Sequence, residues 1–142
     1  MVRQLARSAH PFVVAAFIAC AVIQVFLAGL GVFDTPSAFI THREFGYTFG
    51  WLTLVILVLA LVGRMPRRIV GLSALILVLF AFQSIFVALR EDMPQVAALH
   101  PLNGFAILFV SSIALRASWA LRRDRAGAVA NASPLVRADV PQ

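Results

Sequence analysis

Two histidines stand in the same local pattern at two places in the chain. A proline lies six positions before each of them, and a glycine lies four positions after, at Gly46 for His42 and at Gly104 for His100. Neutral imidazole nitrogen is a ligand for transition metals and for haem iron. A pattern that recurs at this distance indicates an internal repeat. The sequence therefore predicts two similar helical hairpins, each offering one histidine at an equivalent height.

A glutamine precedes each histidine inside an otherwise apolar run. Gln24 lies 18 positions before His42, and Gln83 lies 17 positions before His100. An amide without a partner is costly in lipid, so we expect both glutamines to point into the protein. They could serve as interhelical hydrogen-bond partners, or they could orient the histidines and contact a cofactor.

The elements that must position these residues are transmembrane helices. The chain has 142 residues, of which 61% are hydrophobic and only 13% are charged, whereas soluble domains have about 25% charged residues. Four stretches lack every charged residue type, and each has the roughly 20 residues that a helix needs to cross a bilayer. They are Pro11–Phe33, Phe45–Gly63, Ile69–Leu89 and Met93–Leu115.

The predicted fold is all-α: an integral membrane four-helix bundle made of two parallel-repeated helical hairpins. The first and third helices run in the same direction, so the repeat axis lies along the membrane normal. In a consecutive up-down bundle the second and fourth helices are diagonal neighbours. His42 and His100 can then face each other across the centre. Pro101 is expected to kink the fourth helix just after His100.

The charge pattern orients the predicted bundle. The net charge of +6 comes from twelve arginines and no lysine. Most of them flank the predicted helices on one side, which the positive-inside rule places in the cytoplasm. We therefore expect a multi-pass protein of the cell membrane, with both termini cytoplasmic and both histidines toward the outer face. This pattern explains the basic charge without nucleic acid as a partner.

The distribution of charged and apolar residues divides the chain into three segments. Residues 1–10 are expected to be a basic cytoplasmic lead with His10 exposed, residues 11–122 the transmembrane domain, and residues 123–142 a disordered cytoplasmic tail. The tail is rich in alanine and has no apolar periodicity.

Two imidazoles from diagonal helices suit the two axial positions of a b-type haem. The glycines after the histidines could leave room for the flat macrocycle, although such glycines also serve helix packing. Arg43 and Arg90 lie at the outer rim, where they could pair with the propionates or remain solvated loop charges. The metal ligands in this hypothesis are His42 and His100.

Other chemistries have less support in the sequence. There is no HExxH zinc motif, and two histidines underfill a zinc site. No nucleophile elbow or phosphate-binding glycine loop is present, and no carboxylate lies within a predicted helix core. The sequence favours a redox accessory over an enzyme, in contact with the lipid bilayer and with a redox or membrane-protein partner. The alternatives are a structural or assembly subunit acting through the Gly46 and Gly50 face, and a small-solute carrier or channel.

The order of these residues resembles one four-helix half of heme A synthase. A glutamine on an outward helix is followed by a short loop and by His-Arg at the start of the next helix, and the arrangement then recurs without the arginine. The resemblance covers about residues 11–121, and it extends equally to small four-helix membrane proteins of unknown function that share that ancestry. It implies that His42 and His100 are the haem ligands of one half, with Gln24 and Gln83 at its glutamine positions.

The chain also departs from the heme A synthase pattern. Phe39 stands where the catalytic half of that family carries a glutamate, and the only cysteine, Cys20, cannot form the outer-loop cysteine pair of some members. The resemblance therefore implies a cofactor-holding half, used in electron transfer or as a haem-binding accessory, rather than a haem-hydroxylating enzyme.

Overall fold

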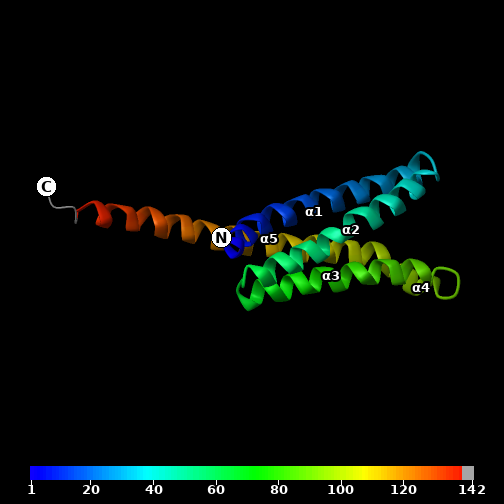
Figure 1. The fold of residues 1–142 in the computed structure, drawn as a ribbon. Helices are drawn as coiled ribbons and strands as arrows, with labels where there is room; N and C mark the ends of the chain where they lie inside the picture. The colour runs from blue at the N-terminus through cyan, green and yellow to red at the C-terminus, as the bar shows by residue number, and fades with distance from the viewer. Residues whose placement is uncertain (139–142) are drawn as a thin grey trace.

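The computed structural model describes the backbone of residues 1–138 and the side chains of residues 1–124 and Gly127. The described part of the chain contains helices and turns and no strand (Figure 1), which confirms the all-α prediction. The helices are α1 Val2–Phe33, α2 Ala38–Val62, α3 Arg67–Ala88, α4 Pro94–Ala97 and α5 Leu99–Ala138.

Four segments are long and apolar enough to cross a membrane, as expected from composition. They are Val2–Phe33, Ala38–Val62, Arg67–Ala88 and Pro94–Asp124. Large apolar side chains cover their outer surfaces, including Phe26, Trp51 and Phe109, each more than 60% exposed. A hydrocarbon environment accommodates such a surface, whereas soluble proteins rarely expose so large an apolar area.

The helices form two antiparallel hairpins that lie side by side (Figure 1). The first hairpin consists of α1 and α2, and the second consists of α3, α4 and α5. α1 packs on α5 and α2 packs on α3, while α2 and α5 make no close backbone approach within the described residues. The diagonal arrangement predicted for the two histidine-bearing helices is therefore present.

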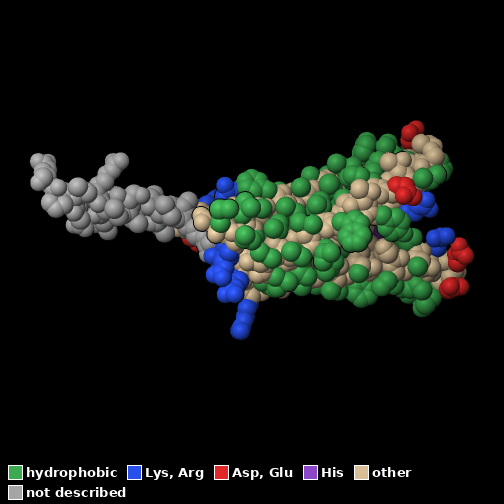
Figure 2. Space-filling view, viewed as in Figure 1, with side chains coloured by type: hydrophobic (Ala, Val, Ile, Leu, Met, Phe, Trp, Pro, Cys, Tyr) green, Lys and Arg blue, Asp and Glu red, His purple; other side chains and the backbone are tan. Residues whose placement is uncertain are grey.

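The two ends of the bundle differ. The histidine end carries the loops 34–37 and 89–93, and there the two hairpins part from each other (Figures 1 and 2). The arginine end carries the N-terminus and the turn 63–66, and Figure 2 shows basic side chains gathered there. Acidic side chains gather mainly at the histidine end.

The buried core repeats between the hairpins. Each buried residue of α3 has a buried counterpart 59 positions earlier in α1, and each buried residue of α2 has a buried counterpart 58 positions later in α5. The first-hairpin members are His10, Val14, Phe17, Phe49, Thr53, Ile56 and Ala60. Their counterparts are Ile69, Ser73, Ile76, Ile107, Ser111, Ala114 and Ser118. The internal repeat thus extends from the histidine pattern to the packing of the core.

The break in the fourth membrane segment lies one turn earlier than expected. The chain turns at Ala98, between α4 and α5, rather than just after His100. Proline has no N–H to donate to the carbonyl four residues earlier, and its ring clashes with that carbonyl. For Pro101 the affected carbonyl is that of Ala97, so the helix is interrupted there.

The helix boundaries differ from the predicted segments at both ends of the chain. α1 begins at Val2, so the expected lead of residues 1–10 is part of the helix. The expectation that His10 is exposed was wrong, because its exposed fraction is 0%. α5 continues past Arg122 to Ala138, so its helical backbone runs through most of the segment expected to be a disordered tail. The last four residues, 139–142, lie outside the described residues.

Candidate functional site

The side chains of the two repeated histidines approach each other between the two hairpins, at the histidine end of the bundle. His42 comes from the first turns of α2, and His100 comes from the first turn of α5. Their ring centroids are 6.2 Å apart, and the ring planes are inclined by 63°. Both residues are half-buried, at the end where the hairpins part. The structure therefore brings together the two residues that the sequence pattern singled out.

Each of these histidines is held by the glutamine of its own hairpin. The Nδ1 atom of His42 lies 3.0 Å from the main-chain carbonyl oxygen of Gln24, and Nδ1 of His100 lies 3.2 Å from that of Gln83. A carbonyl oxygen can only accept a hydrogen bond, so Nδ1 must carry the proton in both rings. A neutral imidazole then keeps an unprotonated Nε2, the form in which histidine binds a metal.

The glycines of the repeat make room for the glutamine side chains. A Cβ added at Gly46 would lie 2.7 Å from Nε2 of Gln24, and one added at Gly104 would lie 3.4 Å from Nε2 of Gln83. An amide from the neighbouring helix therefore lies directly beside each glycine. The contact is much tighter at Gly46 than at Gly104.

The glutamine amides have different surroundings in the two hairpins. The Nδ2 atom of Asn103 donates to Oε1 of Gln83 at 2.9 Å and to the carbonyl of Leu79 at 2.7 Å. Phe45 occupies the equivalent position, three residues after His42. Oε1 of Gln24 is buried and has no hydrogen-bond partner among the described residues. The side-chain oxygen of Gln83 is therefore hydrogen-bonded, whereas that of Gln24 has no partner among the described residues.

Asn103 is a site residue that the sequence reasoning missed. It is 9% exposed and lies one turn after His100 on the inner side of α5. The available signal was a strongly polar residue inside an apolar run, the same signal that identified the glutamines.

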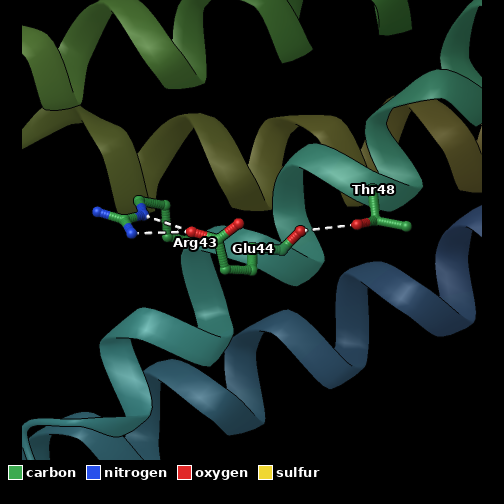
Figure 3. Close-up of polar contacts among 3 residues, drawn as sticks. All are labelled: Arg43, Glu44 and Thr48. Atoms are coloured by element: carbon green, nitrogen blue, oxygen red, sulfur yellow. Dashed lines mark hydrogen bonds and ion pairs between the residues drawn. The ribbon is translucent and has the colours of Figure 1, made fainter.

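The two arginines at the histidine end are exposed and paired locally. Arg43 contacts Glu44 at 2.8 Å and Arg90 contacts Glu91 at 3.1 Å, with arginine side chains 61% and 64% exposed. Figure 3 shows Arg43 and Glu44 together on α2, where the Glu44 carbonyl also accepts a hydrogen bond from Thr48. Exposed pairs of this kind contribute little to stability. Both arginines therefore remain accessible for an anionic group at this end.

A second polar cluster lies near the arginine end. Nε2 of His10 lies 3.2 Å from Oγ of Ser73, and Nδ1 lies 3.0 Å from Oγ of Ser118. Both hydroxyl oxygens are also 2.8 Å from a carbonyl oxygen of their own helix. The cluster connects α1, α3 and α5. Because both ring nitrogens already have partners, His10 is a packing group and a poor candidate for a metal ligand.

The comparisons with known proteins find a similarity over part of this site. A family of unknown function (DUF6220) matches residues 24–89, a little under half of the chain. The match includes Gln24, His42 and Gln83, and it ends before His100. No curated protein matches the chain, and no solved structure matches it. None of these comparisons shows a link to heme A synthase. Residues 24–89 are thus similar to a family of unknown function, within a membrane-helix bundle.

Proposed function

We propose that the chain binds one b-type haem between His42 and His100 and that it takes part in electron transfer. The observation that carries the proposal is the matched pair of imidazoles, each with Nδ1 bonded to a main-chain carbonyl. Histidines that bind metals usually donate their other ring N–H in this way, which fixes the ring and leaves Nε2 for the metal. Two such rings across a bundle centre suit the two axial positions of a haem.

The separation of the rings supports one metal ion between them. Imidazole nitrogen binds metal ions at about 2 Å. The ring centre lies roughly 1 Å behind that nitrogen, so two imidazoles on opposite sides of one metal have centroids about 6 Å apart. The measured centroid distance is 6.2 Å.

The set of donor atoms favours haem over a bare metal ion. Among residues whose side chains are described, no group of three or more His, Cys, Asp or Glu could hold an ion. A zinc site needs three or four protein ligands. A haem needs only the axial ones, because its macrocycle supplies the other donors. Two histidines are therefore a sufficient set for haem and an insufficient one for zinc.

Electron transfer is the role that fits two histidine ligands. When bound, a haem supplies one-electron chemistry, and its axial ligands set the potential. His42 and His100 would both hold the haem iron, so the proposed role is electron transfer rather than the binding of a substrate to the metal. The resemblance to one half of heme A synthase supports the same cofactor. Phe39, in place of the catalytic glutamate, is the reason that hydroxylation is not part of the proposal.

The structure weakens the alternative of an assembly subunit acting through the Gly46 and Gly50 face. A Cβ at Gly50 would lie 2.5 Å from the ring of Phe80, and one at Gly46 would meet Gln24. Both glycines therefore pack against residues of the same chain, and their face is not open to a partner. An assembly role would require a different surface.

Absorption spectra of the purified protein, expressed with haem supplied, test the proposal. We expect a Soret band, and sharp α and β bands after reduction with dithionite. His42→Ala and His100→Ala should each abolish this bis-histidine spectrum. His10→Ala, which removes the third histidine at the other end, should keep it. A featureless spectrum from protein with normal helical circular dichroism would refute haem binding.

A further inference from the structure

We infer that the two histidines hold the haem unequally: His100 is the more tightly bound ligand, and His42 is the ligand that is displaced more easily. The inference rests on the proposed function and adds a positioning residue to it. That residue is Asn103, which acts on His100 through Gln83. The same position in the first hairpin, Phe45, supplies no such support.

The second hairpin holds its histidine in a closed hydrogen-bonded frame. Nδ1 of His100 bonds the Gln83 carbonyl, and the side chain of the same glutamine accepts from Asn103. The Asn103 amide also bonds the Leu79 carbonyl, one turn earlier on α3. α3 and α5 are therefore connected at three points within one helical turn of the ligand. Each N–H of the Asn103 amide has its own acceptor.

The first hairpin holds its histidine by one hydrogen bond. Nδ1 of His42 bonds the Gln24 carbonyl, but Oε1 of Gln24 is buried and has no partner among the residues whose side chains are described. Phe45 instead packs against the apolar core. Gly46 lets the Gln24 amide come close, yet close packing adds no hydrogen bond at this position. The two histidines thus occupy equivalent positions in the repeat but are surrounded by different sets of hydrogen bonds.

Unequal support leads to unequal retention of the metal. A ligand whose position is fixed by surrounding hydrogen bonds loses less freedom when it binds, so it binds more tightly. We expect the difference to be about tenfold, the effect of one hydrogen bond on an equilibrium. On the proposed haem, a competing ligand should therefore displace His42 first.

Single-histidine variants measure the two ligands separately. The readout is the rate at which haem leaves the protein for excess apomyoglobin, followed by absorption. His100→Ala, which keeps only His42, should lose haem at least about ten times faster than His42→Ala. Adding Asn103→Leu to His42→Ala should remove this difference in the rate of haem loss. Adding Phe45→Asn to His100→Ala should slow the loss, while Phe45→Leu, which brings no amide, should not.

Carbon monoxide provides a test with both histidines present. Added to the reduced protein, it should bind by displacing His42. Phe45→Asn should slow this binding about tenfold relative to Phe45→Leu. This comparison does not depend on the folding of the single-histidine variants.

The possible results separate this inference from the proposed function. A wild-type protein without haem overturns both. A bis-histidine haem with equal loss rates for His42→Ala and His100→Ala, and with no effect of Asn103→Leu or Phe45→Asn, overturns the inference alone. Faster haem loss from His42→Ala than from His100→Ala would reverse the assignment and also overturn it.

Discussion

At the scale of single residues, the chain uses its three histidines in two different ways. His42 and His100 each have Nδ1 bonded to a main-chain carbonyl and no hydrogen-bond partner for Nε2 among the described residues, whereas His10 has hydroxyl partners at both nitrogens. A histidine with both nitrogens occupied stabilises packing, and one with a spare Nε2 can bind a metal. The same residue type therefore has a structural role at one end of the bundle and a candidate ligand role at the other.

The His10 cluster leads to a prediction about Ser118. Ser118→Ala removes a buried hydroxyl and leaves a ring nitrogen of His10 without a partner. We expect a loss of about 1–3 kcal/mol in the free energy of unfolding. Ser112→Ala is the matched control, because Ser112 also bonds a carbonyl one turn earlier on α5 without contacting His10. Denaturation in detergent micelles would measure both variants, and equal stabilities would contradict the role assigned to the cluster.

Part of the candidate site could be predicted from the sequence, and part could not. The repeated spacing was enough to place His42, His100 and the two glutamines, because a repeat in sequence implies equivalent positions in space. His10 was misplaced because charge alone defined the lead, while in the structure one helix carries residue 10 into the core. Asn103 and Phe45 differ from each other at equivalent positions of the repeat, so the repeated spacing does not identify them.

At the scale of helices, α2 and α3 are brought together by Gly50. The ring of Phe80 lies where a side chain at position 50 would begin, at 2.5 Å from the added Cβ. Phe80 also contacts the rings of Phe17 and Phe49, at centroid distances of 6.0 Å and 5.4 Å. These three aromatic rings connect α1, α2 and α3, on the side of Gln24 and Gln83 that faces the arginine end. Gly50 is thus a packing position, as expected for small residues at membrane-helix interfaces.

A substitution at Gly50 tests this packing. Gly50→Ala must move the Phe80 ring, which its aromatic neighbours resist, so we expect a destabilisation of about 1–3 kcal/mol. Gly71→Ala is the control, since an added Cβ at Gly71 meets nothing within 4 Å. That change should be neutral or stabilise α3 by about 0.5–1 kcal/mol. Thermal unfolding followed by circular dichroism distinguishes the two, and a neutral Gly50→Ala would show that the ring moves freely.

Helix existence was easier to predict than helix ends. Apolar runs of membrane-spanning length identified all four segments, because the hydrocarbon thickness sets their length. Their ends depend on short-range effects that composition does not show. α1 extends to Val2 although its first turns are basic, and Arg7 there donates to the carbonyls of Gly63 and Arg64. Those contacts hold the start of α1 against the turn between α2 and α3.

At the scale of the whole molecule, the two ends of the bundle differ in charge. Basic residues at the arginine end have few acidic neighbours, whereas Arg43 and Arg90 at the histidine end are each paired with a glutamate. Arg122 also lies over the rings of Phe12 and Trp119, at 4.8 Å and 5.1 Å from their centroids. Aromatic and basic side chains together are typical of a membrane–water interface. The arginine-end members are Arg3, Arg7, Arg64, Arg67, Arg68, Arg122 and Arg123.

This asymmetry predicts the orientation of the protein in the membrane. Basic residues close to membrane helices are retained on the cytoplasmic side, so the arginine end should face the cytoplasm and the candidate haem site the opposite side. Single cysteines in a Cys20→Ser background would report the orientation, since Cys20 is the one native cysteine. In intact cells, a membrane-impermeant thiol reagent should label Thr35→Cys, in the loop after α1, and should leave Arg67→Cys, at the start of α3, unlabelled. Permeabilised cells are the control, because both positions are exposed and should then react. Labelling of Arg67→Cys alone in intact cells would invert the orientation and would place the candidate haem site, with any electron partner, on the cytoplasmic side.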